Sequence, residues 1–178
     1  MELRFGEWCV RSFRRGDVRS LTAYANNPLV AQYLRDTFPF PYRETDAKAW
    51  IRIAANQVPE CNFAIASKQE AIGGIGLQFA NDVFRSNAEL GYWLGEPFWG
   101  RHIATHAVQA FTQYAFSTFE IEKLTAGVFE GNLASTRVLA KNGFVLEGKF
   151  RKHLVKNGEF KDYHVYSLWR QDPPMTEK

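Results

Sequence analysis

The sequence has few cysteines and no metal-binding pattern. Cys9 and Cys61 are its two cysteines, and neither a CxxC nor an HExxH pattern occurs. A disulfide framework or a zinc site needs several such residues at set spacings, so we expect reduced thiols and no metal. His102 and His106 stand four residues apart, but no third ligand accompanies them.

Long apolar runs are also missing. No stretch approaches the roughly 20 apolar residues of a membrane-spanning helix. The opening MELRFGEWCVRSF has no apolar segment of the signal-peptide kind, so we expect a cytoplasmic protein with no membrane partner. The excess of positive charge is small too: the sequence has 22 Lys and Arg against 19 Asp and Glu, a net charge of +3. This small, scattered excess suits an anionic cofactor and argues against a nucleic-acid partner, which needs a clustered basic face.

What the sequence does contain is a globular α/β pattern. Its 178 residues, 46% of them hydrophobic, suit one domain with a sizeable core. The periodicity predicts strands at 3–14, 62–68, 71–80, 87–95, 123–129, 144–155 and 160–170, and helices at 17–26, 29–34, 45–56, 101–118 and 133–141.

Local signals mark several ends of these elements. Asp17 is a suitable N-cap for the first helix, and Asn157-Gly158 is a strong hairpin signal. In the helix 45–56 we expect Ala49, Trp50, Ile53 and Ala54 to share one buried stripe. The order predicts a single α/β (α+β) domain over residues 1–172, with a mixed, mostly antiparallel sheet of about seven strands flanked by helices, and a flexible tail at 173–178.

The corner before the helix 101–118 is unusual. Gly95-Glu96-Pro97 ends a strand, Gly100 follows, and the helix then begins with Arg101 and His102 rather than with acidic residues. Free amides and the helix dipole make such an end attractive to phosphate, and a glycine allows close approach. A plain strand-to-helix turn is an equally good interpretation of the spacing alone.

A resemblance favours the phosphate-binding interpretation. The segments VAQYLRDTFPFPY with DAKAW, IGGIGLQ, AELGYWLGEPFWGRHIATHAV, and EGNLASTRVLAKNGF with GKFRKH and DYHVYSL resemble the GNAT superfamily of acetyl-CoA-dependent N-acyltransferases, and within it the RimJ/RimL branch. The resemblance implies that the strands near 88–94 and 124–128, the family's fourth and fifth, splay apart. It also implies that the pantetheine arm of acetyl-CoA lies in the gap.

The resemblance assigns cofactor-binding residues. The phosphate loop falls on Trp99, Gly100, Arg101, His102, Ile103 and Ala104, followed by Thr105, while Tyr92, Trp93 and Leu94 would pair with pantetheine, and Asn132 and Ser135 would contact it. Trp99 stands where Gln or Arg is usual, and His102 where Gly is usual. The imidazole of His102 either crowds the diphosphate or bonds a phosphate oxygen. Asn132 is also a good N-cap, which is the structural alternative.

The resemblance also suggests catalytic residues. Glu89 is the candidate general base, and strand alternation places it on one face with Gly91 and Trp93. The alternatives are a solvated strand residue or a partner for an arginine. Leu139 stands where many members carry a tyrosine acid, so Ser135, another hydroxyl or water would protonate the leaving thiolate.

Phe38, Phe40, Tyr42 and Trp93 are candidate walls of the acceptor site, with core packing as the alternative. The expected activity is acetyl transfer from acetyl-CoA to a primary amine, such as a protein N-terminus. A small-molecule amine acetyltransferase and a non-catalytic acyl-CoA sensor are the alternatives. By analogy with the family we expect a homodimer.

Overall fold

The protein is described by a computed structural model that covers residues 1–170. The expected domain end at residue 172 and the expected tail at 173–178 lie outside these residues. The strands are β1 (Glu2–Phe5), β2 (Trp8–Arg11), β3 (Asn62–Ala66), β4 (Ala71–Phe79), β5 (Asn87–Leu94), β6 (Lys123–Phe129), β7 (Val145–Lys156) and β8 (Glu159–Trp169). The helices are α1 (Val18–Ala25), α2 (Pro28–Ala31), α3 (Glu44–Ala55), α4 (Ile103–Thr118) and α5 (Leu133–Lys141).

One mixed sheet of eight strands organises the fold, in the order β1-β2-β3-β4-β5-β6-β8-β7. Every neighbouring pair is antiparallel except β5 and β6, which run parallel. The predicted α/β class with a mostly antiparallel sheet is confirmed. The strand count is eight rather than about seven because the segment 3–14 is a hairpin. Gly6, with a φ of +65°, turns the chain between β1 and β2.

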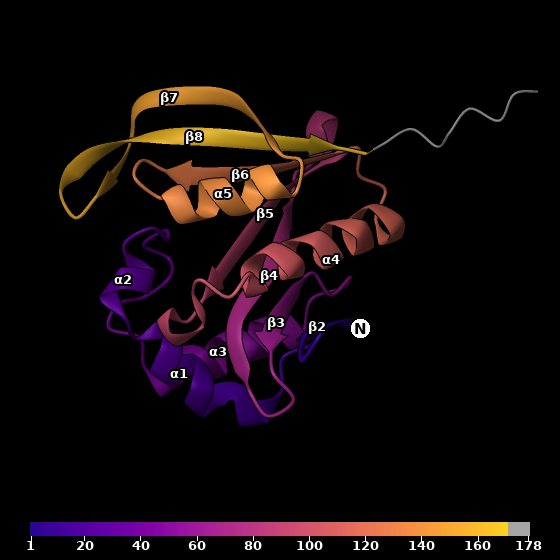
Figure 1. Cartoon of the computed structure of the whole chain (residues 1–178), viewed down its shortest axis with the longest axis vertical. Helices are drawn as coiled ribbons and strands as arrows, with labels where there is room; N and C mark the ends of the chain where they lie inside the picture. The colour runs from indigo at the N-terminus through magenta and orange to yellow at the C-terminus, as the bar shows by residue number, and fades with distance from the viewer. Residues whose placement is uncertain (171–178) are drawn as a thin grey trace, which may run out of the picture.

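Helices cover both faces of the sheet (Figure 1). Strand alternation sends Phe63 and Ile65 of β3 into a cluster with α4 and α5, and Ala64 and Ala66 into a second cluster with α1 and α3. The first cluster is built mainly of large residues, whereas five of the eight buried residues of the second are alanines. Among the helices within residues 1–170, none is long and apolar enough to cross a membrane.

The buried face of α3 differs from the predicted stripe. Ala47, Ile51 and Ala54 are buried, whereas Trp50 is 36% exposed and Ile53 is 51% exposed. Of the expected stripe only Ala54 is buried. The helix turns the face that carries Ala47, Ile51 and Ala54 inward, where it packs against the small side chains of the second cluster.

The β7–β8 hairpin projects toward the side of the molecule where α2 lies (Figure 1). Asn157 and Gly158 have φ values of +53° and +79°, so the predicted Asn-Gly turn is confirmed. Beside the turn, the Lys156 ammonium donates to the Leu34 carbonyl oxygen at 2.8 Å and to Asp36 Oδ1 at 2.7 Å. The hairpin tip is thereby tied to the segment that follows α2.

Asp17 stands at the predicted N-cap position of α1, but its carboxylate has other partners. It accepts two hydrogen bonds from the Arg11 guanidinium, both 2.8 Å long, and others from the amides of Arg14 and Ala71. Both charged side chains are 3% exposed. Burial by itself would raise the pKa of Asp17, but these hydrogen bonds and the Arg11 charge outweigh it and lower the pKa.

Replacing Asp17 by Asn should lower the free energy of unfolding by about 3 kcal/mol, because Arg11 keeps a buried charge without a counter-charge. A lowered pKa in the folded state means that the pair stabilises the protein above the unfolded value of about 3.9, and that this stability is lost as the pH falls through the folded value. Urea unfolding between pH 7 and 2 should show a steeper acid loss in the wild type than in Asp17→Asn.

Asp46→Asn is the matched control, since Asp46 accepts a hydrogen bond from the amide of Arg43 at the exposed start of α3. It should cost less than about 1 kcal/mol, because asparagine keeps an acceptor oxygen and only the negative charge near the start of the helix is lost. Equal costs for the two variants, or parallel acid limbs for Asp17→Asn and the wild type, would contradict the role given to the buried pair.

Candidate active site

The two parallel strands at the centre of the sheet separate partway along their length. β5 and β6 pair at Asn87 with Lys123, Ala88 with Leu124 and Glu89 with Thr125, and no further. β5 then runs on to Leu94, and β6 to Phe129, each bonded only to its other neighbour. The predicted splay is therefore present, and Glu89 stands where it opens.

The ladder between β4 and β5 determines which backbone groups face this opening. The Gly95 amide bonds the Ile72 carbonyl oxygen at 2.8 Å, and the register pairs Gly74 with Trp93. In an antiparallel pair the bonded residues alternate, so Trp93 directs its N–H and C=O toward β4. Tyr92 and Leu94 direct theirs away from β4, into the splay.

Trp99 closes the far end of the opening. Its indole Nε1–H donates to the Leu94 carbonyl oxygen at 2.7 Å, while the ring remains 44% exposed. One of the unpaired acceptors of β5 is thus satisfied within the chain. The amide of Leu94 and both backbone groups of Tyr92 remain directed into the splay.

The corner that follows Trp99 has a left-handed backbone. Gly100 has a φ of +73°, and a Cβ added there would meet nothing within 4 Å, so the space beside it is open. The first turn of α4 closes with the His106 amide bonded to the His102 carbonyl oxygen at 3.1 Å. The amides of residues 103–105 precede this ladder, and the first turn contains no acidic residue. The corner can therefore accept an anion.

His102 also has a left-handed backbone, with a φ of +59° at the N-cap of α4. This left-handed conformation is one that glycine adopts most easily, and histidine tolerates it better than most other residues. Its Nδ1 lies 3.4 Å from the Lys141 ammonium at the end of α5, which brings a cation to the corner.

Arg101 turns the other way. Its guanidinium lies 5.0 Å from the centre of the Trp8 ring and its Nη2 lies 3.4 Å from Glu7 Oε1. Ile103 is 1% exposed and belongs to the core, so it can offer only its backbone to a ligand. Ala104 is partly buried against the same core, and the carbonyl oxygen of Thr105 accepts a hydrogen bond from Asn142 at 3.2 Å.

The start of α5 lies opposite the splayed part of β5. Asn132 is its N-cap, with Oδ1 accepting from the Ser135 amide at 3.1 Å. The hydroxyls of Ser135 and Tyr92 are 2.8 Å apart and join α5 to β5. Burial raises the pKa of Tyr92 to about 12, so its hydroxyl is protonated at neutral pH. Leu139 is fully buried in the core.

Glu89 faces away from α4 and α5, at the mouth of the splay. Its Oε1 accepts from Arg35 Nη2 at 2.5 Å and from the Tyr163 hydroxyl at 3.4 Å. Arg35 follows α2, and Tyr163 belongs to β8. Neither was among the predicted site residues, although an arginine partner was one interpretation of Glu89. Only sheet pairing brings Tyr163 to this point, and no local pattern signals it.

The predicted acceptor-site aromatics separate into two groups. Phe38 contacts Trp93 edge to face at 5.5 Å between ring centres, and Tyr42 at 5.1 Å. Trp93 lies on the same face of β5 as Glu89. Tyr42 is 5% exposed and serves the core, while Phe40 is 52% exposed. Phe38 and Trp93 therefore remain the candidates for walls of the acceptor site, because they lie on the face of β5 that carries Glu89.

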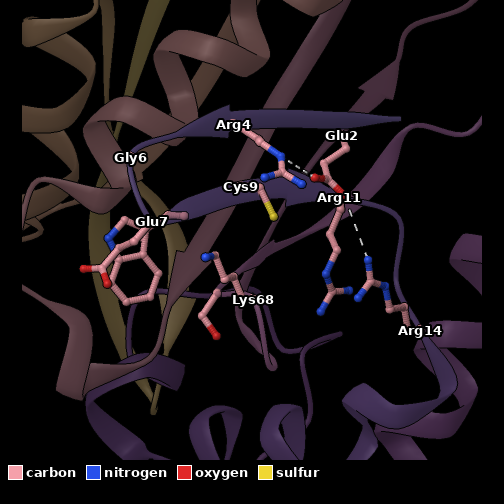
Figure 2. Close-up of a pocket in the computed structure, with 10 residues that line it drawn as sticks. Glu2, Arg4, Gly6, Glu7, Cys9, Arg11, Arg14 and Lys68 are labelled. Atoms are coloured by element: carbon pink, nitrogen blue, oxygen red, sulfur yellow. Dashed lines mark hydrogen bonds and ion pairs between the residues drawn. The ribbon is translucent and has the colours of Figure 1, made fainter.

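A separate hollow of about 130 Å³ lies on β1 and β2, where Figure 2 shows Glu2, Arg4, Cys9 and Arg14 around it. Two of its arginines pair with the same glutamate, since Arg4 lies 2.7 Å and Arg14 4.0 Å from Glu2. None of the predicted site residues lines it. Residues 1–170 contain no cluster of three His, Cys, Asp or Glu that could hold a metal ion.

The left-handed backbone at His102 yields a stability prediction. Because alanine keeps a Cβ in this conformation and glycine does not, His102→Gly should be more stable than His102→Ala by about 1 kcal/mol in urea unfolding. At the neighbouring Arg101, which is not in the left-handed region, the order should reverse. A His102→Ala variant as stable as His102→Gly would contradict the geometry of the corner.

Comparisons with known proteins agree with this geometry. Residues 8–145 match the family model described as "Acetyltransferase (GNAT) domain". A Bacillus subtilis protein named "Probable N-acetyltransferase YjcK" is 36% identical over 116 residues, 64% of each chain, so the matched stretch spans under two thirds of that relative. The B. subtilis "Putative ribosomal N-acetyltransferase YdaF" is 33% identical over 149 residues, 84% of this chain and 76% of that protein.

A solved structure of RimL, a ribosomal L7/L12 α-N-protein acetyltransferase in complex with coenzyme A, superposes with a TM-score of 0.83. It is 20% identical and covers 95% of this chain and 98% of its own, a likeness of fold. The family model spans well over half of the sequence and includes the splayed strands and the corner before α4. The chain therefore belongs to the GNAT family of acetyltransferases.

Proposed function

We propose that this protein transfers the acetyl group of acetyl-CoA to a primary amine, and that the amine is the N-terminus of a peptide or protein. The observation that carries the proposal is the splay, whose free backbone groups at Tyr92 and Leu94 lead directly to the anion-accepting corner at residues 100–105. An extended arm with a diphosphate at one end matches both features.

The residues around the splay fit acetyl-CoA as a cosubstrate. The amides of residues 103–105 and the Lys141 cation would hold the diphosphate, with open space beside Gly100. The amide-bearing arm would bond the free groups of Tyr92 and Leu94, as an added strand does. Asn132 Oδ1 already caps α5, so its Nδ2 donor remains for a pantetheine carbonyl oxygen.

The reaction forms a bond between the amine nitrogen and the acetyl carbon and breaks the bond from that carbon to sulfur. The Leu94 amide faces the splay, where it can donate to the oxygen that becomes negative. Glu89 would take the proton that the attacking amine loses. Ser135, which shares a hydrogen bond with Tyr92, would donate to the departing thiolate. Since a thiol has a pKa near 8.5, that last step needs little help.

The charges at the acceptor side favour a peptide N-terminus. A peptide α-amine has a pKa of about 8, so an appreciable fraction is neutral near neutral pH, whereas alkylamines are almost fully charged. The Arg35 guanidinium beside Glu89 would repel an acceptor with several ammonium groups. The relative named as a ribosomal N-acetyltransferase supports the same choice.

A thiol-release screen tests the proposal. With acetyl-CoA present, peptides that begin with Ala or Ser should turn over faster than polyamines, aminoglycosides and free amino acids. Faster turnover of a small amine would contradict the peptide acceptor and identify a small molecule as the acceptor. Binding of acetyl-CoA without thiol release from any amine would indicate a sensor rather than an enzyme.

Glu89→Gln should lower kcat by about 100-fold, because a positioned base contributes that much or more. The acidic limb of the pH–rate profile should change with it, and binding of acetyl-CoA should not. Glu70→Gln is the control, because Glu70 also accepts from a tyrosine hydroxyl, that of Tyr24, but lies in the β3–β4 turn. An acidic limb that is the same in Glu89→Gln and the wild type would remove Glu89 from the mechanism.

A further inference from the structure

We propose that Arg35 and Tyr163 are positioning residues that together fix the Glu89 carboxylate for the acceptor amine. This inference rests on the proposed function and extends it to two residues outside the phosphate loop and the pantetheine-binding strand. Both side chains donate to the same oxygen, Oε1, at 2.5 Å and 3.4 Å. Among residues 1–170, no hydrogen bond reaches Glu89 Oε2, which leaves that oxygen to a substrate.

Tyr163 reaches Glu89 only because β6 has a glycine in its path. Gly127 lies on the strand between β5 and β8, and a Cβ built on it would overlap the Tyr163 hydroxyl. The phenol therefore crosses β6 over Gly127 and places its hydroxyl at the opening of the splay. A glycine in the middle of a strand weakens the strand, so the crossing is made at a cost to the sheet.

A bulge in β7 fixes the ring from the other side. Phe150 pairs with Tyr163 and Leu154 with Lys161, so residues 151–153 stand opposite the single residue 162. The bulge turns the His153 ring onto the Tyr163 ring, with centres 5.6 Å apart and planes at 19°. Bulges commonly redirect a side chain beside a functional site in this way.

The bulge contains one residue in a strained backbone conformation. Lys152 has a φ of +49°, and its amide bonds Asp162 Oδ1 at 2.8 Å. Such a conformation persists only where the surroundings enforce it, and it is frequent at functional sites. The hydrogen bond to Asp162 holds this strained turn, which places the His153 ring against Tyr163.

Arg35 is anchored through the same hairpin. The Lys156 ammonium bonds the Leu34 carbonyl oxygen and Asp36 Oδ1, the residues on either side of Arg35. The β7–β8 hairpin thus sets the place of both donors, one through its bulge and one through its tip. An isolated surface ion pair between Arg35 and Glu89 would need neither the Gly127 crossing nor the bulge.

These contacts orient the carboxylate. With Oε1 engaged by a guanidinium and a phenol, the group cannot rotate freely, and Oε2 keeps one direction. The 3.4 Å bond from Tyr163 is long, as catalytic contacts without substrate often are, and can shorten in the acceptor complex. Arg35 and Tyr163 act through Glu89, so their effect should exist only while Glu89 is present.

A double-mutant cycle tests this dependence, with the peptide that turns over best as the acceptor. Tyr163→Phe should lower kcat about tenfold and leave the Kd for acetyl-CoA within about twofold, since a hydrogen bond to a charged group is lost. In a Glu89→Gln background the same change should alter kcat by less than about twofold. Arg35→Gln should show the same non-additivity. Tyr24→Phe, which removes a tyrosine–glutamate bond elsewhere, should leave kcat unchanged.

Gly127→Ala provides a second variant that keeps the phenol but displaces it. It should reproduce the kcat loss of Tyr163→Phe and add nothing when combined with it. A tenfold loss from Tyr163→Phe in both the wild-type and Glu89→Gln backgrounds would overturn the inference, as would a Tyr163→Phe variant with wild-type kcat. Both of these outcomes leave the wild-type enzyme active, so they overturn this inference alone. A wild-type protein that turns over no amine would overturn the proposed function and this inference together.

Discussion

The separation of β5 and β6 after Glu89 is the constraint on which the rest of the site depends. Three residue pairs join the strands. Beyond these pairs, the backbone groups of Tyr92 and Leu94 that point away from β4 have no partner strand. Unpaired backbone groups inside a sheet are costly, so such an opening persists only where the surroundings hold it and something satisfies it. Trp99 satisfies one carbonyl oxygen, Tyr92 joins Ser135 on α5, and an extended ligand can satisfy the others.

The splay itself was expected only from the family resemblance, whereas several features around it could be predicted from local signals in the sequence. The Asn-Gly turn, the glycine corner and the alternation on β5 each need only a few neighbouring residues. The first hairpin was missed although its apolar positions change phase across Gly6, from Leu3 and Phe5 to Trp8 and Val10. The helix α3 buries a different stripe because its partner face is mainly alanine. Arg35 and Tyr163 lie 54 and 74 residues from Glu89, so only the assembled sheet brings them there.

Two departures from the family pattern have structural explanations. His102 takes a left-handed conformation that glycine adopts readily and directs its ring toward Lys141, so the corner lies beside a cation. Leu139, where many members carry a tyrosine, is core, and the hydroxyls of Tyr92 and Ser135 lie on the same side of the sheet. Among residues 1–170, four non-glycine residues have positive φ, and two of them lie in the corner before α4 (His102) and in the β7 bulge (Lys152). Strain of this kind is characteristic of functional regions.

The central claim is that the backbone of β5 beyond Glu89 binds the arm of coenzyme A. Amide hydrogen exchange, with and without coenzyme A, tests it residue by residue. The amides of Tyr92 and Leu94, with those of residues 103–105, should exchange more slowly when coenzyme A is present, while those of Gly91 and Trp93, already bonded to β4, should not change. Unchanged exchange at Tyr92 and Leu94 under saturating coenzyme A would contradict the account.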